Sequence, residues 1–229
     1  MRVGGCAKGA GMIHPRMATL IAVVTTDAAL EPEAADGLLR RVAGRTFNRI
    51  SVDGDTSTND TLYLLASGAA GAAEGADLAR LEAAVEAVCG RLARALVADG
   101  EGATKVARIE VTGGRDAAQV ERIAEAICRS ALVKTALFGE DANWGRIVAA
   151  AGAAGAGLTP ETTRLWLEEL LLYDRGLPTG AGRSPEAAAL MARPELGFRL
   201  DLGQGRAATT HWTCDLSYDY VRINAEYRT

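Results

Sequence analysis

Apolar and polar residues alternate along this chain with two different periods, which together predict a mixture of strands and helices. Runs of roughly four to eight apolar residues, bounded by glycine or polar residues, are typical of buried strands. Longer segments whose apolar residues recur three and four positions apart are typical of helices that bury one face. The strands expected in the first half of the chain are residues 19–26, 48–52, 61–66 and 106–111.

The helical spacing predicts three helices, over residues 32–44, 76–98 and 117–130. Pro32 suits the first turn of the first helix, because the N–H that proline lacks has no partner within the helix at that position. The third pattern continues to residue 137, which leaves open a longer helix.

The last third of the chain is expected to be rich in strands, with Ser184 and Pro185 opening one short helix that ends at Met191. The glycine-rich residues 1–18 predict irregular chain, and the alanine-rich and glycine-rich residues 147–157 predict close packing or a loop. The strands expected in this last third are residues 164–173, 195–202, 207–215 and 218–223.

Strands and helices follow one another without the strict rhythm of a doubly wound parallel sheet. The order of the elements therefore predicts an α/β or α+β fold and nothing narrower. A chain of 229 residues that is 48% hydrophobic can bury a real core, as one domain or as a large part of one.

The net charge of −4 and the isoelectric point near 5.4 argue against nucleic acid or an anionic membrane as the main partner. The sequence has neither an apolar run of about 18 residues, as a membrane span requires, nor the apolar region of a signal peptide. We therefore expect a cytoplasmic protein.

The cysteines and histidines of the chain argue against disulfides, multi-histidine metal sites and histidine-based triads. The four cysteines are widely spaced and form no Cys-x-x-Cys pair, so they are expected to be reduced and mostly buried. His14 and His211 are the two histidines of the sequence, which makes a multi-histidine metal site or a histidine-based triad a weak hypothesis. The four cysteines are Cys6, Cys89, Cys128 and Cys214.

One segment near the start, residues 8–20, suggests covalent catalysis. Thr19 stands where a glycine-rich stretch meets an apolar strand, and the small residue Ala18 precedes it. If the Ala18–Thr19 bond were cut, the new α-amino group of Thr19 would lie beside its own hydroxyl, with a reference pKa of roughly 7.7–8.0. The same residues also fit a loop that simply leads into a core strand.

The same segment resembles the self-cleavage site of the ornithine acetyltransferases, the bifunctional glutamate/ornithine N-acetyltransferases of arginine biosynthesis. Residues 8–19 match the family pattern Lys-Gly-x-Gly-Met-Ile-x-Pro-x-Met-Ala-Thr without a gap. Further matches follow in the family's order through the whole chain. They are residues 48–61, 100–105, 139–146 and 223–229.

The resemblance implies a layered helix–sheet–sheet–helix architecture of the N-terminal-nucleophile type. Family members are usually made as a longer precursor that cuts itself before the threonine. Residues 1–18 would then be the end of the α portion, and residues 19–229 the β chain that begins at the nucleophile. The implied assembly is an α2β2 heterotetramer.

The implied reaction is a ping-pong transfer of acetyl from N2-acetylornithine to glutamate through an acetylated Thr19. Some family members also use acetyl-CoA as the donor, and the family needs no metal and no resident cofactor. Ala18 and Thr19 match the cleavage site, and Thr19 matches the catalytic nucleophile. The positions that match the family's substrate-binding residues are Lys8, Thr19, Glu101, Asn224 and Thr229.

Two polar segments are not expected to have a catalytic role. Residues 53–61 hold several carboxylates and hydroxyls and are expected to form a local turn network. Asn143, Trp144 and Arg146 are expected to pack and hydrogen-bond near the catalytic face.

The family takes its oxyanion donors from a Thr-Gly pair in the α portion, and this pair is not in the chain. The chain alone is therefore expected to be inactive. Two alternatives stay open: an N-terminal-nucleophile aminopeptidase or amidohydrolase, and an inactive fragment that lacks the α half.

Overall fold

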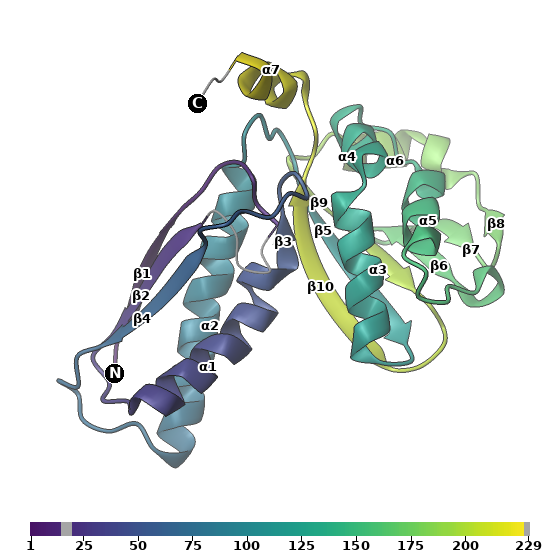
Figure 1. Cartoon of the computed structure of the whole chain (residues 1–229). Coiled ribbons are helices and arrows are strands. Elements are labelled where there is room, and N and C mark those ends of the chain that lie inside the picture. Colours follow the sequence, from purple (N-terminus) through teal and green to yellow (C-terminus); the bar gives the residue numbers. More distant parts are fainter. Residues whose placement is uncertain (15–19, 227–229) are drawn as a thin grey trace. The chain divides into compact units, whose positions relative to one another are not determined.

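The computed structural model describes residues 1–14 and 20–226, drawn as ribbon in Figure 1. The chain divides into two compact units, residues 1–99 and residues 100–229. Each unit contains both strands and helices.

The first unit is built on a sheet of three strands in the order β1-β2-β4. The pair β1 and β2 is antiparallel, and the pair β2 and β4 is parallel. Along β2, the side chains of Ala22, Val24 and Thr26 are buried and alternate with more exposed neighbours, as expected of a strand with one covered face. The three strands are β1 (Val3–Lys8), β2 (Ile21–Thr26) and β4 (Thr61–Ala66).

The strand β1 corrects the expectation that residues 1–18 are irregular. Its glycines are explained by the helix that packs on this strand, α2 (Gly75–Ala98). A Cβ atom at Gly5 would lie 3.0 Å from the carbonyl oxygen of Val23 and 3.2 Å from side-chain atoms of Val88 and Leu92. Gly5 therefore lets the helix approach the sheet closely, whereas the sequence alone suggested irregular chain.

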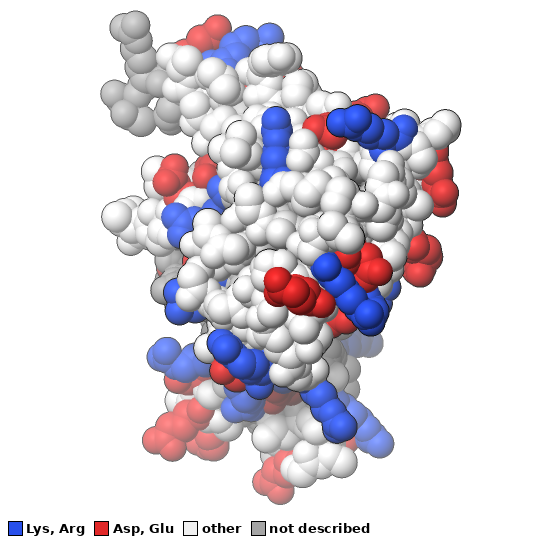
Figure 2. All heavy atoms as spheres, turned by 90° about the vertical axis from the view of Figure 1, so that its right-hand side faces the viewer, with Lys and Arg blue, Asp and Glu red and all other residues white. Residues whose placement is uncertain are grey.

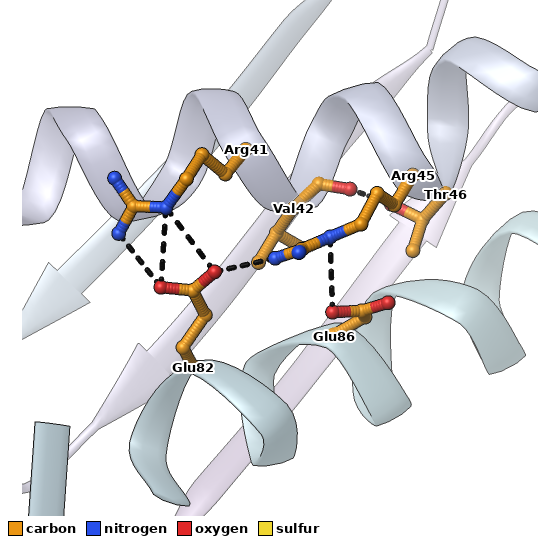
Figure 3. Close-up of polar contacts among 6 residues, drawn as sticks. All are labelled: Arg41, Val42, Arg45, Thr46, Glu82 and Glu86. Carbon is orange, nitrogen blue, oxygen red and sulfur yellow. Dashed lines mark hydrogen bonds and ion pairs between the residues drawn. The ribbon is translucent and has the colours of Figure 1, made fainter. Parts of the chain in front are cut away.

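Helix α1 (Pro32–Arg45) begins at the expected proline and lies against α2. Two arginines of α1 reach two glutamates of α2, as Figure 3 shows. Arg41 Nη2 lies 2.7 Å from Glu82 Oε2, Arg45 Nη2 binds the other oxygen of Glu82, and Arg45 Nε lies 3.1 Å from Glu86 Oε2. These charge-assisted bonds, led by the one from Arg41, lower the pKa of Glu82 to about 2.

The strand expected at residues 48–52 is shorter than predicted. A 3-10 turn, η1 (Phe47–Arg49), occupies its first part, and β3 (Ile50–Ser51) follows. The polar residues 53–60 then form a loop that leads into β4.

The described residues of the second unit, 100–226, form six strands, in the order β10-β5-β9-β6-β7-β8. The pair β5 and β9 is parallel, and the other neighbours are antiparallel. Where one strand was expected over residues 164–173, the chain turns back at Glu168, whose φ of 50° lies in the left-handed region. The strands are β5 (Val106–Gly114), β6 (Arg164–Leu167), β7 (Leu170–Asp174), β8 (Leu177–Pro178), β9 (Glu195–Asp201) and β10 (Ala207–Cys214).

Helix α3 packs on β5 and β10 and contacts α5, around a continuous buried cluster. The pattern that continues to residue 137 is two helices, because the backbone of Ser130 is extended and its hydroxyl accepts the N–H of Val133 at the start of the second. The alanine-rich run beyond residue 147 is largely helix rather than loop. These helices are α3 (Ala117–Arg129), α4 (Ala131–Phe138), α5 (Trp144–Ala153) and α6 (Pro185–Met191).

The chain ends in a helix, α7 (Tyr218–Glu226), where a strand over residues 218–223 was predicted (Figure 1, yellow). The prediction was wrong because a short segment of aromatic and branched residues favours a strand by propensity. The hydroxyl of Ser217 instead accepts the backbone N–H of Tyr220, which starts a helical turn.

The surface carries charges of both signs. On the face that Figure 2 shows, acidic and basic side chains are interspersed over a largely uncharged surface. Of the helices in residues 1–14 and 20–226, none is both long and apolar enough to cross a membrane. Cys6 is exposed, whereas Cys89, Cys128 and Cys214 are buried, and all four are free thiols.

We expect the substitution Glu82→Gln to weaken the packing of α1 on α2 in a pH-dependent way. The pKa of Glu82 is lower in the folded chain than its ordinary 4.5, so its ion pairs stabilise the fold above pH 4.5 and are lost as the pH falls toward 2. After screening by solvent, the variant should be less stable by about 1 kcal/mol at pH 7 and equal to the wild type near pH 2. Chemical denaturation at both pH values measures this difference.

The control is Asp36→Asn, which removes an exposed ion pair to Arg40 within α1. If Glu82→Gln and Asp36→Asn have the same free energy of unfolding at every pH, Arg41 and Arg45 do not stabilise the fold through Glu82.

Candidate active site

The loop of residues 53–60 binds the chain just before the predicted cleavage site. The carboxylate of Asp53 accepts the backbone N–H groups of Met12 at 2.6 Å and Ile13 at 3.0 Å. The N–H of Val52 donates to the carbonyl of Ile13 at 2.6 Å, and the hydroxyl of Thr56 donates to the carbonyl of His14. These bonds fix residues 12–14 against the loop.

The end of the same loop binds the chain just after the cleavage site. The backbone N–H of Leu20 donates a short hydrogen bond to Asp60 Oδ1. The N–H of Thr61 donates to the carbonyl of Leu20 at 2.9 Å. One loop therefore holds the chain on both sides of residues 15–19, and Ala18 and Thr19 themselves lie outside the described residues.

Sequence reasoning missed this function of the loop. The expected local turns are present: the N–H of Asp55 donates to Asp53 Oδ1, and the N–H of Asn59 donates to the hydroxyl of Ser57. The bonds that matter for the site instead span about forty residues of sequence. Apart from the family pattern, no signal in a single sequence pairs residues so far apart.

Asp60 is electrostatically unusual. Burial raises the pKa of its carboxyl to about 6, although the hydrogen bond from Leu20 opposes the shift. Its second oxygen, Oδ2, is buried and has no hydrogen-bond partner among the described residues. This carboxyl adjoins a pocket of about 120 Å³ whose walls include Leu20, Phe47 and Leu62.

Lys8 is held at the end of β1. In the antiparallel ladder it lies opposite Ile21, the first residue of β2 and the second residue after Thr19 in sequence. Its side chain is exposed. The ladder therefore fixes the backbone of Lys8, a predicted substrate-binding residue, beside Ile21. Ile21 begins the strand that follows the predicted nucleophile, Thr19.

Glu101 and Asn224 are in direct contact in the second unit, although 123 residues separate them in sequence. Asn224 Nδ2 donates to Glu101 Oε2 at 2.9 Å and also to the carbonyl of Tyr220 at 3.0 Å. The structure therefore brings together two of the predicted substrate-binding residues. Thr229, another predicted substrate-binding residue, lies outside the described residues.

Gly102 makes the contact between Glu101 and Asn224 possible. Its φ is +66°, and a Cβ atom there would lie 2.4 Å from the backbone nitrogen of Tyr220 and 2.8 Å from Ser217 Oγ. The hydroxyl of Ser217 donates to the carbonyl of Gly102 at 2.6 Å. The first turn of α7 therefore rests directly on the backbone of the Gly-Glu-Gly turn.

Charged side chains fix the segment that follows this turn. Asp215 accepts the backbone N–H groups of Thr104 and Lys105 and, at 2.6 Å, the hydroxyl of Thr104. The buried ammonium group of Lys105 lies 2.9 Å from Glu140 Oε1. Through these bonds, two of the family motifs, residues 100–105 and 139–146, are joined to the chain just before α7.

The residues of the second polar segment are used for packing. The Asn143 side chain accepts the N–H of Arg146 and so caps α5, and Trp144 stacks on Tyr173 with ring centroids 5.2 Å apart. Arg146 Nη1 donates to the carbonyl of Leu132 at 2.8 Å.

One of the two histidines takes part in a contact between a strand and a helix. His211 Nε2 lies 2.6 Å from Glu121 Oε2 and joins β10 to α3. Within residues 1–14 and 20–226, no three His, Cys, Asp or Glu side chains are grouped so that they could hold a metal ion.

Comparison with known proteins identifies the family. The sequence model of the ArgJ family matches residues 1–229, the whole chain. This chain is a member of the ArgJ family.

The resemblance found in the motifs is thereby confirmed. Arginine biosynthesis bifunctional protein ArgJ 1 of Nostoc sp. is 46% identical over 241 residues, which cover 100% of this chain and 58% of that protein. The mitochondrial ArgJ protein of Schizosaccharomyces pombe is 45% identical and is covered to 53%. The chain thus spans about half the length of these ArgJ relatives.

A solved structure confirms the fold class. The crystal structure of the ArgJ protein of Bacillus halodurans matches 90% of this chain and 98% of that chain, with 41% sequence identity and a TM-score of 0.84. The predicted mixed α/β class is therefore that of the ArgJ family.

We expect Gly102→Ala to detach α7 from the Gly-Glu-Gly turn. The new Cβ would overlap the backbone nitrogen of Tyr220, and the positive φ adds strain of about 1 kcal/mol. Limited proteolysis should cut the variant within or just before α7 much faster than the wild type.

Gly44→Ala provides a matched control, because it adds the same methyl group to open space within α1. That variant should gain about 0.5–1 kcal/mol of stability from the higher helix propensity of alanine. Equal protease resistance of α7 in Gly102→Ala and Gly44→Ala would show that Gly102 is not needed for the contact.

Proposed function

We propose that this chain is the C-terminal part of an acetyltransferase of arginine biosynthesis that moves an acetyl group from N2-acetylornithine to glutamate. The observation that carries the proposal is the match of the whole chain to relatives that are named bifunctional ArgJ proteins. The loop that binds the chain on both sides of Ala18–Thr19 supports a self-cleavage step at that bond.

In the proposed cleavage, Thr19 Oγ attacks the carbonyl carbon of Ala18, and the Thr19 nitrogen leaves as an amine. The resulting ester is opened by water, which leaves a carboxylate on Ala18 and a free α-amino group on Thr19. The neutral amine can then take the hydroxyl proton of its own residue, because its reference pKa of roughly 7.7–8.0 is close to neutral pH.

In the proposed transfer, Thr19 Oγ attacks the acetyl carbonyl of N2-acetylornithine. The α-nitrogen of ornithine takes up a proton and leaves, and an acetyl ester remains on Thr19. The amino group of glutamate then attacks this ester, which regenerates the hydroxyl and releases N-acetylglutamate. The developing oxyanion is expected to be bound by donors of the α portion.

The substrate-binding roles follow from charge. The ammonium group of Lys8 suits the α-carboxylate of an amino acid. The carboxylate of Glu101 suits an ammonium group of the substrate, and Asn224, which touches Glu101, can fix a polar end of the same molecule. The family pattern also assigns Thr229 to substrate binding.

Further properties belong to the same proposal. The enzyme would work in the cytoplasm as an α2β2 assembly, with residues 1–18 ending the α portion and residues 19–229 forming the β chain. It would need no metal or resident cofactor, and acetyl-CoA is a possible second acetyl donor.

We expect the complete protein to yield a chain that starts at Thr19. Intact mass after denaturation should show this product in the wild type and uncut precursor for Thr19→Ala, because alanine has no nucleophile. Thr19→Ser keeps a hydroxyl and should still be cut. A wild-type protein that stays whole, or is cut elsewhere, would contradict the proposed mechanism.

We expect the 229-residue chain alone to have little or no transferase activity. Loss of one oxyanion donor typically costs on the order of 10²–10³ in rate, and the proposed donors lie in the α portion. Mixing the chain with a separately made α portion should restore acetyl transfer to glutamate. Full activity of the isolated chain would place the oxyanion donors within it.

A further inference from the structure

Lys134 is a charged residue in the interior of the second unit. It lies on α4, and only 2% of its surface is exposed. Its ammonium group donates to the hydroxyl of Thr213 at 2.9 Å and makes a short hydrogen bond to the carbonyl of Cys214. The sulfur of Cys214 lies 3.7 Å from the same nitrogen. Among the described residues, the groups that bind this ammonium are therefore uncharged.

The charge of Lys134 is unfavourable to the stability of the fold. Burial of an ammonium group costs free energy, and neutral acceptors compensate for only part of that cost. A methionine has a similar length and would fill the same space without burying a charge. What the ammonium adds is direction, because its two charge-assisted hydrogen bonds fix the end of β10.

The contacts of α4 hold the chain where α7 begins. β10 ends at Cys214, and α7 begins at Tyr218. Between them, the backbone N–H of Leu216 donates to the carbonyl of Lys134 at 3.2 Å. The ring of Phe138, at the end of α4, meets the ring of Tyr218 edge to face with centroids 5.3 Å apart. The start of α7 is therefore fixed by α4.

The direction of α7 decides whether Asn224 reaches Glu101. Asn224 lies more than one helical turn beyond Tyr218, and its Nδ2 donates to Glu101 Oε2 at 2.9 Å. A small tilt at the start of the helix moves the amide group out of hydrogen-bond distance, because the displacement grows along the helix. The contact between Asn224 and Glu101 thus depends on how the chain before α7 is held.

We propose that Lys134 is a positioning residue that sets the place of the Asn224 amide beside Glu101. It fixes the end of β10, which fixes the direction of α7, and it acts on the substrate through Asn224. Self-cleavage does not require it, because the proposed cleavage uses Thr19 and the donors of the α portion. This inference rests on the proposed function, because it takes Glu101 and Asn224 to bind the amino-acid substrate.

The test compares Lys134→Met with Val120→Ala in the complete protein, with the N-terminal portion present. Val120 is buried in the core cluster under α3, so its truncation shows what a loss of packing alone does. In Lys134→Met we expect KM for glutamate to rise roughly tenfold, with kcat changed less than about twofold and self-cleavage complete by mass. Val120→Ala should keep KM within about twofold of the wild type.

A double variant shows whether Lys134 acts through Asn224. Adding Lys134→Met to Asn224→Ala should raise KM no further, because the amide that Lys134 positions is already absent. Limited proteolysis of the same proteins follows the helix itself. We expect α7 to be cut faster in Lys134→Met than in the wild type or in Val120→Ala.

Thermal unfolding separates positioning from a structural role. Lys134→Met removes a buried charge, and the hydroxyl of Thr213 keeps its bond to the carbonyl of Cys128 at 3.1 Å. The variant should therefore be at least as stable as Val120→Ala, which creates a cavity.

Each result bears on one of the two proposals. If the wild type cuts itself and transfers acetyl, and Lys134→Met keeps the wild-type KM, the inference is wrong and the proposed function stands. Equal increases of KM with and without Asn224→Ala would also overturn the inference, because Lys134 would then act independently of Asn224. So would a Lys134→Met protein that fails to fold or is less stable than Val120→Ala, because the ammonium would then be structural. A wild type that neither cuts itself nor transfers acetyl would reject the proposed function, and this inference with it.

Discussion

Backbone N–H groups bound by two aspartates organise the functional end of the first unit. Asp53 accepts the N–H groups of Met12 and Ile13, and Asp60 accepts that of Leu20. Ile13 and Leu20 are buried residues, and a buried N–H that loses its hydrogen bond is costly. The two carboxylates therefore fix where the chain enters and leaves residues 15–19.

The second constraint is that a helix packs closely against the backbone of a glycine, once in each unit. Gly5 lets α2 approach the sheet of the first unit, and Gly102 lets α7 rest on the turn that carries Glu101. A methyl group at Gly102 would collide with the backbone of Tyr220, and one at Gly5 would make unusually tight contacts of 3.0–3.2 Å, so both spacings depend on the absence of a side chain. The contact between Glu101 and Asn224 is a result of the second approach.

Much of the fold could be predicted from the period of apolar residues, and the failures have specific physical causes. The long helix α2 was predicted almost to the residue because it buries one regular face, and the strand at residues 61–66 was predicted from its short apolar run. β1 was missed because its glycines allow close packing and do not mark a loop. α7 was missed because the cap from Ser217 and the packing of the helix on Gly102 outweigh the strand propensity of its residues. The bonds of Asp53 and Asp60 join distant residues, which no local pattern encodes.

The ladder between β1 and β2 has a consequence for any protein that is cut before Thr19. Residues 3–8 and residues 21–26 are paired along six positions, and the cut would lie between the two strands. An intrachain hairpin would become an interface between two polypeptides without the loss of a single ladder hydrogen bond. The connection that kept the strands together would be gone, so the stability of this sheet would depend on protein concentration, as it does in an obligate dimer. The two pieces would migrate as one particle in native conditions and separate on dilution or in denaturant.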